Sequence, residues 1–387
     1  MATLVCADVP KGVSVTLDHH QFDVDGELVG RGAWTGVRNL PPGAHFCATT
    51  PTSKGASTSW QSCFPTGFFF YVEGGVEGEC HVVEWCAETE SLVECVDDDR
   101  RRELEQRSRS DLDYLSRMLR YDPAWQDAWR GVSAHITAET IRRVSPVGSR
   151  IGVEGEPDDP SLASTPHERM LEEQLRRGGR EEGAGATTSR SRDARCFYLD
   201  LPQLGGRGSP SARKFLEKSG LTGSALTALH LDKSPVLEDL LERELGGNHD
   251  ELLGEMQFAF VCFLLCYSLT GFNQWKRLLV LALGSERSML ETRPEFAVEL
   301  LRALRNQLEL ALREAEAAAL VDEVLGEEKH FLASGIRGFL LSVAEAEVVP
   351  VAVEEEAAWL AALVRSRLGV AGLEVEDDED APVVVQL

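Results

Sequence analysis

One stretch near the centre of the chain constrains its fold more than any other: LLGEMQFAFVCFLLCYSLTGFNQWKRLL, at residues 252–279. It carries no formal charge between Glu255 and Lys276, which is close to the length of a bilayer-spanning helix. Polar residues and a glycine interrupt it, however, and the unbroken apolar part from Phe258 to Tyr267 is too short to cross a membrane. We therefore expect a helix that is buried on all sides in the core of a domain.

The residues around this stretch predict where its helices begin and end. Asn248 can cap a helix whose first turn is acidic, and Gly271 can close that helix because glycine readily adopts the left-handed conformation. A second helix is expected over residues 272–283, with Lys276 on its water-facing side.

The composition limits the compartment and the partners. The formal net charge of −25 disfavours binding to nucleic acid or to anionic lipid, and it favours a basic protein surface as partner. The nine cysteines are odd in number and lack the spacing of a disulfide framework. With no secretory signal in MATLVCADVPKG, we expect free thiols in a reducing compartment, the cytoplasm or the nucleus.

Two groups of cysteines are candidates for reactive or metal-binding sites. Cys262 and Cys266 lie one helical turn apart and could be redox-active or bind a metal, but we favour two small hydrophobic side chains in a packed core. Cys80, His81 and Cys86 are the closest approach to a set of metal ligands. A strand running ECHVVEW would send the adjacent Cys80 and His81 to opposite faces, so we predict no metal site.

The patterns along the chain predict an α+β multidomain protein. Residues 1–146 form a β-rich domain with a helical appendix, because short β-branched and aromatic runs alternate with turns until about residue 96 and helical spacing follows. The glycines of EGGVEGE predict a hairpin, and helices are expected to break near Asp122-Pro123. Residues 147–195 form a flexible linker, since they are rich in Gly, Pro, Ser and charge.

The second half of the chain is predicted to be helical over residues 196–375. Ser234-Pro235 begins a helix that ends at Leu245, and Thr292 with Glu295 forms a capping box for a helix to about residue 312. Further helices are expected at about 314–325, 328–343 and 353–368. Short loops between consecutive helices indicate an antiparallel stack, of the kind that can wind into a superhelix.

The last residues, 376–387, form an acidic tail that ends in PVVVQL. Val383, Val384 and Val385 have the β propensity to add a strand to an exposed sheet edge of another protein. Docking of the same strand on this protein's own sheet, or disorder, are the alternatives that the residues themselves leave open.

No catalytic motif stands in a suitable context. Asp18, His19 and His20 suggest an acid–base cluster, but adjacent histidines on a strand point to opposite faces and no nucleophile lies nearby. The glycine-spaced GELVGRG lacks a following helix that could bind phosphate. We therefore predict no enzyme activity, no catalytic residue and no cofactor.

Several segments resemble the alpha-two-repression (AAR-two) splicing-factor family. They are VPKGVSVTLD, LPPGAHFC, GFFFYVEGG with VVEW, LGEMQFAFVCFLL, WKRLLVL and the terminal DAPVVVQL. The resemblance covers residues of about 9–145 and 230–387, and its most specific part is 253–279. The sequence departs from the family in its long Gly/Arg linker, in LSRMLRYDP near residue 117 and in a tail that stops at Leu387.

This resemblance implies an N-terminal β-rich domain and a C-terminal helical domain similar to the VHS superhelical type. It implies a non-catalytic assembly factor in pre-mRNA splicing that binds the large scaffold protein of the U5 small nuclear ribonucleoprotein through its RNase H-like and Jab/MPN-like domains. Such a factor delays loading of the RNA helicase and RNA, without direct contact to nucleic acid or membrane. The residues that match the family's partner-binding tail strand are Pro382, Val383, Val384, Val385, Gln386 and Leu387.

The sequence also supports three further hypotheses about function and regulation. A trafficking adaptor is the alternative function, because VHS-like domains also recognise sorting peptides. A hydrolase would use Asp18 with His19 or His20. Phosphorylation at Ser189 or Ser191 in the linker could tune release of the partner.

Overall fold

The fold is described from a computed structural model. The structure describes residues 1–24, 33–51, 64–76, 78–152, 196–201, 215, 229, 231–313 and 331–368. The chain divides into two compact units, one made of Met1–Asp200 with Glu244–Trp275 and the other of Leu201–Arg243 with Lys276–Leu387. The domain boundaries expected at residues 146, 195 and 375 stay predictions.

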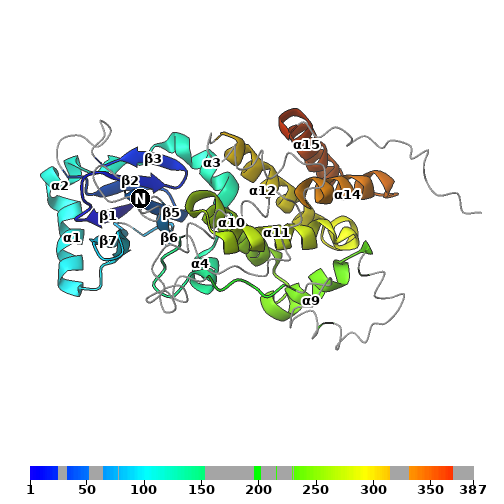
Figure 1. Ribbon diagram of the computed structural model, residues 1–387, viewed down its shortest axis with the longest axis horizontal. Helices are drawn as coiled ribbons and strands as arrows, with labels where there is room; N and C mark the ends of the chain where they lie inside the picture. Colours follow the sequence, from blue (N-terminus) through cyan, green and yellow to red (C-terminus); the bar gives the residue numbers. More distant parts are fainter. Residues whose placement is uncertain are drawn as a thin grey trace, which may run out of the picture. The chain divides into compact units, whose positions relative to one another are not determined.

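The first unit contains two β-sheets. A five-stranded sheet has the order β8-β7-β1-β4-β9, in which β1 is parallel to β7 and antiparallel to β4. A four-stranded antiparallel sheet has the order β3-β2-β5-β6 (Figure 1). The strands are β1 Ala2–Ala7, β2 Val13–Leu17, β3 His20–Asp23, β4 Gly36–Leu40, β5 Gly43–Pro51, β6 Thr66–Val72, β7 Cys80–Cys86, β8 Ser91–Glu94 and β9 Leu119–Arg120. This architecture confirms the predicted N-terminal β domain.

Strand β1 shows how the five-stranded sheet is buried on both faces. Leu4 and Cys6 belong to a core shared with the four-stranded sheet, whereas Val5 and Ala7 pack on the opposite face with Leu104 of helix α1. This alternation follows from the two-residue period of a strand. The strand therefore reads as a continuous apolar run rather than an alternating one.

Short helices complete the N-terminal part of this unit: α1 Asp98–Ser110, α2 Leu112–Ser116, α3 Pro123–Ser133 and α4 Ala138–Val144. The predicted break near Asp122-Pro123 is confirmed, because the Asp122 side chain caps α3 and Pro123 is its first residue. The helical spacing predicted through Leu119 is wrong. Leu119 instead lies in β9 opposite Val37, after α2 has ended at Ser116.

The predicted hairpin at EGGVEGE is also wrong. Strands β6 and β7, which flank it, belong to different sheets. Gly75 and Gly78 have φ angles of 93° and 74°, so these glycines supply left-handed backbone conformations in the loop that connects the two sheets.

The predicted central helix is α10, His249–Cys266, and it is buried along nearly its whole length. Asn248 caps it as expected by accepting a hydrogen bond from the backbone of Asp250. The predicted end is wrong: Tyr267, with a φ of 54°, supplies the left-handed cap. Gly271 lies inside the next helix, α11 Leu269–Leu283, where a Cβ atom would be 2.8 Å from the carbonyl oxygen of Ala259. The glycine thus allows close packing rather than ending a helix.

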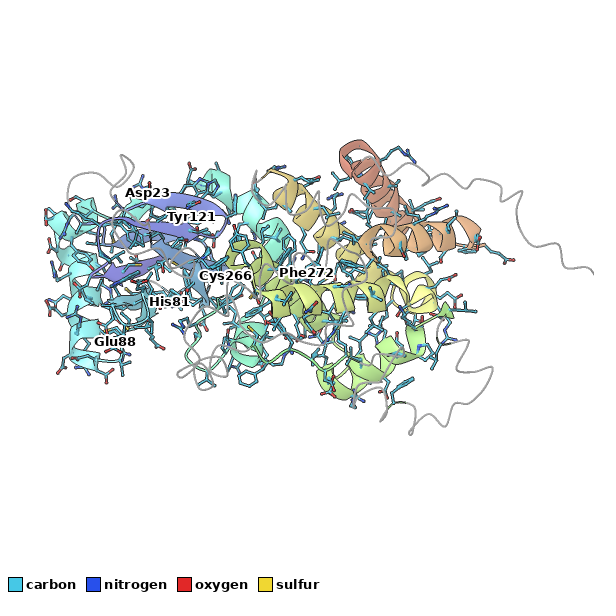
Figure 2. All side chains as sticks on the ribbon, in the orientation of Figure 1. Asp23, His81, Glu88, Tyr121, Cys266 and Phe272 are labelled. Atoms are coloured by element: carbon cyan, nitrogen blue, oxygen red, sulfur yellow. The ribbon has the colours of Figure 1, made fainter. Side chains whose placement is uncertain are left out.

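The side chains of α10 and α11 also pack on the sheet and on each other. Phe258 stacks on Phe69 of β6 with ring centroids 4.2 Å apart, and Phe263 lies 4.8 Å from Phe272 by the same measure. Figure 2 labels Phe272 on α11 and Cys266 at the end of α10. Residues 244–275 therefore share a core with the N-terminal strands.

The second unit is helical within its described residues, which confirms the predicted helical domain. Its helices are α9 Ser234–Leu245, α12 Pro294–Arg313, α14 Phe331–Glu345 and α15 Val351–Leu368, with a π-helical turn η4 at Ser288–Thr292. Thr292 ends this turn, and Pro294 begins α12. The helix expected at 314–325 and the start of the one expected at 328 lie outside the described residues.

Lys276 corrects a further expectation in this unit. It was predicted to face water, but it is buried and its ammonium lies 5.0 Å from the ring centroid of Phe331. The long alkyl stem lets the residue fill a core position while its charge meets an aromatic face. Within the described residues, no helix has the length and apolarity that a bilayer crossing requires.

Candidate functional site: buried polar clusters and the approach to the tail

The predicted partner-binding residues, Pro382 to Leu387, lie outside the described residues, as do Ser189 and Ser191. The described helix nearest to this tail in sequence is α15. Glu356 on α15 accepts hydrogen bonds from Arg302 at 3.0 Å and from Arg305 at 2.8 Å, both on α12. Because charge-assisted pairs fix orientation as well as distance, the helix that precedes the predicted tail strand has a defined rotation on α12.

Asp18 forms the centre of a buried polar cluster in the β domain. Its backbone is left-handed, with a φ of 57°, and its side chain is fully buried. The carboxylate accepts a hydrogen bond from the Tyr121 hydroxyl at 2.7 Å and another from the Phe46 backbone at 3.1 Å. The Nδ1 atom of His45 lies 3.0 Å from the same carboxylate, and the His45 Nε2 atom lies 2.8 Å from the carbonyl oxygen of Pro41.

The His45 ring therefore has an acceptor at each nitrogen, which favours the doubly protonated imidazolium. Burial lowers the pKa of His45, but the charge and hydrogen bond of Asp18 raise it, and the net direction is upward. The cluster joins β5, the β2–β3 turn and the segment before α3 by an internal ion pair.

This arrangement differs from the acid–base cluster considered for Asp18, His19 and His20. The carboxylate faces His45 and Tyr121 instead, while His20 stacks on Trp125 with ring centroids 4.3 Å apart. Burial lowers the pKa of His20. A fully buried carboxylate cannot reach a substrate, so the Asp18 cluster supports the fold rather than chemistry. The sequence carries no local signal for the pairing, because His45 is 27 residues from Asp18.

The sulfur and imidazole groups considered as metal ligands each have a different neighbour. The Cys80 thiol lies 3.8 Å from the Ser108 hydroxyl, and the His81 ring lies 3.1 Å from Glu79. Burial raises the pKa of Cys80 to about 11. A hydrogen bond from the Thr89 side chain lowers the pKa of Cys86. These contacts do not bring the three side chains to one point.

Cys262 and Cys266 are buried in α10, as the core interpretation predicted. Burial raises the pKa of Cys262 well above its usual value, so this thiol stays protonated and unreactive. None of the eight cysteines in the described part of the chain forms a disulfide.

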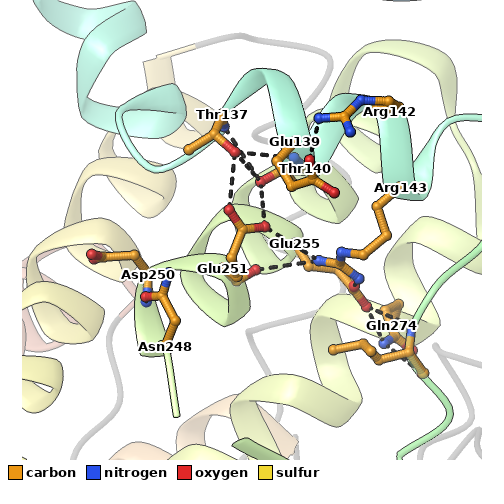
Figure 3. Close-up of polar contacts among 11 residues, drawn as sticks. Thr137, Glu139, Thr140, Arg142, Arg143, Asn248, Asp250, Glu251, Glu255 and Gln274 are labelled. Atoms are coloured by element: carbon orange, nitrogen blue, oxygen red, sulfur yellow. Dashed lines mark hydrogen bonds and ion pairs between the residues drawn. The ribbon is translucent and has the colours of Figure 1, made fainter. Parts of the chain in front are cut away.

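A second cluster surrounds Glu255, the single carboxylate in residues 252–279. Its side chain is fully buried on α10 and receives an Arg143 hydrogen bond from α4 at 2.5 Å (Figure 3). The backbone of Leu199 donates at 2.9 Å and the Gln274 side chain at 2.8 Å. The cluster thus connects α4, α10, α11 and the segment 196–200. Burial raises the pKa of Glu255 above its usual value, although the Arg143 charge opposes this shift.

Neighbouring turns of α10 make further contacts with the α3–α4 region. Glu251 accepts hydrogen bonds from Thr137 at 3.0 Å and from Thr140 at 3.1 Å (Figure 3). A Cβ atom on Gly254 would lie 2.4 Å from the carbonyl oxygen of His135, so the two backbones approach closely. Sequence reasoning missed this interface, and its one available signal was a lone carboxylate inside an apolar helix. The interface makes α10 a rigid part of the first unit.

Comparison with known families assigns both parts of the chain. Residues 1–146 match the family described as AAR2 N-terminal domain, and residues 209–371 match the one described as AAR2 C-terminal repeat region.

Individual relatives agree with this result. The chain is 27% identical to the human (Homo sapiens) "Protein AAR2 homolog" over 396 residues, which cover 100% of this chain and 94% of that protein. It is 27% identical to the mouse (Mus musculus) protein over 393 residues with the same coverage. The protein of Caenorhabditis elegans is 31% identical over 264 residues, or 66% of this chain and 67% of that protein.

Proposed function

This chain belongs to the AAR2 family, and from that premise we propose that it is a non-catalytic assembly factor for the U5 small nuclear ribonucleoprotein in pre-mRNA splicing. The observation that carries the proposal is the match of both the N-terminal and the C-terminal family domains to one chain. The two buried polar clusters support it, because both are enclosed and tie segments together instead of presenting groups to a substrate.

We propose that the partner is the large spliceosomal scaffold protein, bound through its RNase H-like and Jab/MPN-like domains. The formal net charge of −25 suits a partner whose surface is basic because it later faces RNA. Occupying that surface delays loading of the helicase and of RNA until the particle matures. The chain itself then needs no direct contact with nucleic acid or membrane, and it acts in the cytoplasm and in the nucleus.

We propose further that residues 382–387 add a β-strand to the partner. Main-chain hydrogen bonds would supply the affinity, and the alternate valines would supply the specificity. A tail and a globular surface on one chain bind more tightly together than either does alone, because the second contact becomes intramolecular.

Affinity purification from cells tests this function. The tagged full chain, a truncation after Asp380 and the variants Val384→Pro and Val384→Thr are compared by mass spectrometry of the recovered proteins. Proline cannot donate a ladder hydrogen bond, whereas threonine keeps the β-branched shape. We expect the scaffold protein with the full chain and with Val384→Thr, and much less of it with the other two. Recovery of vesicle-coat or sorting proteins instead would favour a trafficking adaptor.

A further inference from the structure

Helix α15 has apolar side chains on two opposite faces. Val353, Leu360 and Val364 face inward and are fully buried. On the other side Val351 is 68% exposed and Trp359 is 62% exposed, and Val348 just before the helix is 83% exposed. Large apolar side chains scattered singly on a surface are normal, but three such exposed side chains within twelve residues of the chain are a denser group than that. We call Val348, Val351 and Trp359 the α15 outer face.

Trp359 is held in place although most of its ring is exposed. The Arg305 guanidinium lies 5.6 Å from the centroid of the Trp359 ring, and Arg305 is itself fixed by its 2.8 Å hydrogen bond to Glu356. One side of the indole therefore rests on a fixed cation while the rest faces solvent. Trp and Arg are both enriched among the few residues that carry most of the binding energy at protein interfaces.

The charge around the outer face indicates the chemistry of its partner. Residues 337–365 contain five glutamates against two arginines, Arg337 and Arg365, which stand at the two ends of this segment. Glu356 accepts hydrogen bonds from the two arginines of α12. The other four glutamates are exposed: Glu345, Glu347, Glu354 and Glu355. Exposed apolar side chains with mostly acidic neighbours fit a partner segment in which apolar side chains are flanked by Lys or Arg.

The same charges disfavour two other occupants of the outer face, namely the tail of this chain and a second copy of the protein. Residues 369–387 contain six acidic residues and no basic one, so the glutamates around the outer face would repel them. In a symmetric pair of copies the outer face meets itself, which would place Glu354 and Glu355 close to their own counterparts. Neither arrangement neutralises these glutamates.

We propose that the α15 outer face is a docking surface for a basic, apolar segment of a partner protein. The inference rests on the proposed function in one respect, namely that this partner is the scaffold protein which the tail also binds. Residues 369–381 lie between α15 and the predicted tail strand, and a chain of that length extends to at most about 45 Å. The outer face and the tail can therefore engage neighbouring parts of one partner.

Binding of a scaffold fragment that contains the RNase H-like and Jab/MPN-like domains is the first test. The full chain is compared with Trp359→Glu, Val351→Glu and the control Leu231→Glu, which adds the same charge at an 80% exposed residue of the same unit. We expect the first two to weaken binding at least about tenfold and the control to leave it unchanged. Wild-type binding is also expected to weaken as salt rises. Circular dichroism checks that each variant is folded. If Trp359→Glu does not fold, the binding test relies on Val351→Glu.

A second probe separates this inference from the proposed function. It is a fluorescein-labelled amphipathic helix of Leu and Lys, titrated into the same proteins. If the scaffold fragment binds none of them, the proposed function fails, and saturable peptide binding that Trp359→Glu abolishes still supports the docking surface. Scaffold binding that needs the tail but ignores both outer-face variants would overturn the inference. Self-association of the wild type that Trp359→Glu abolishes in sedimentation would also overturn it, in favour of a second copy.

Discussion

Removing Arg143 should expose how much the first unit depends on the Glu255 cluster. In Arg143→Ala the Glu255 carboxylate stays fully buried but loses its cation. Breaking a buried ion pair by removing one partner costs about 3–5 kcal/mol. Glu255 keeps the hydrogen bonds from Leu199 and Gln274, and Arg143 is itself 23% exposed, so we expect the lower part of that range at pH 8.

The pH dependence of this loss identifies its cause. The pKa of Glu255 is already raised by burial, and without the Arg143 charge it rises further. A carboxyl whose folded pKa exceeds its unfolded value binds more protons when folded, so stability falls as pH increases from about 4 through the folded pKa. The cost of Arg143→Ala should therefore be smaller at pH 5 than at pH 8, and adding Glu255→Gln should recover part of it.

The assay is urea unfolding followed by circular dichroism, with hydrogen–deuterium exchange of α10 peptides to locate the change in the first unit. Arg142→Ala is the matched control, because Arg142 is the neighbouring residue, is 71% exposed and pairs with Glu139 at the surface. Its loss should be within about 1 kcal/mol. If Arg143→Ala unfolds like Arg142→Ala at pH 8, and α10 exchange is unchanged, the account of the Glu255 cluster is wrong.

Three further predictions concern other contacts of the described residues. His45→Gln should destabilise the first unit by about 2–4 kcal/mol at pH 5.5. The raised pKa of His45 means that its ion pair weakens above its folded pKa, so in urea unfolding from pH 5.5 to 8.5 wild type should lose more stability than the variant as pH rises. Gly254→Ala should lower stability by about 1–3 kcal/mol because the new methyl group meets a carbonyl at 2.4 Å, whereas Gly338→Ala, with nothing within 4 Å, should not lower it in the same melts. A thiol reagent followed by peptide mass spectrometry should modify Cys86, whose pKa is lowered, long before Cys262; equal rates would contradict the packing of α10.

Local signals in the sequence predicted the elements that depend on neighbouring residues. Asn248 caps α10 and Asp122 with Pro123 begins α3, because each cap joins a side chain to a backbone group two residues away. The role of Gly271 could not be decided from the sequence, for a physical reason. Gly271 satisfies both a helix end and a close helix contact, and only the position of Ala259 in three dimensions decides between them.

Contacts between residues far apart in the chain could not be predicted from the sequence. Glu255 meets Arg143 across 112 residues, and Asp18 meets Tyr121 across 103, so no local pattern records either pair. Lys276 was assigned to water from its charge, because the aromatic ring of Phe331 that receives its ammonium is far along the chain. The polar interior of this protein is therefore a product of its tertiary structure.

Competition for the scaffold protein tests the central claim most directly. The purified full chain is mixed with the two-domain scaffold fragment and the U5 helicase, and the complexes are separated by size-exclusion chromatography. The assembly-factor account predicts a stable complex of chain and scaffold that excludes the helicase, together with helicase binding once residues 381–387 are deleted. A complex that holds all three proteins at once, or no binding of the full chain to the scaffold, would contradict it.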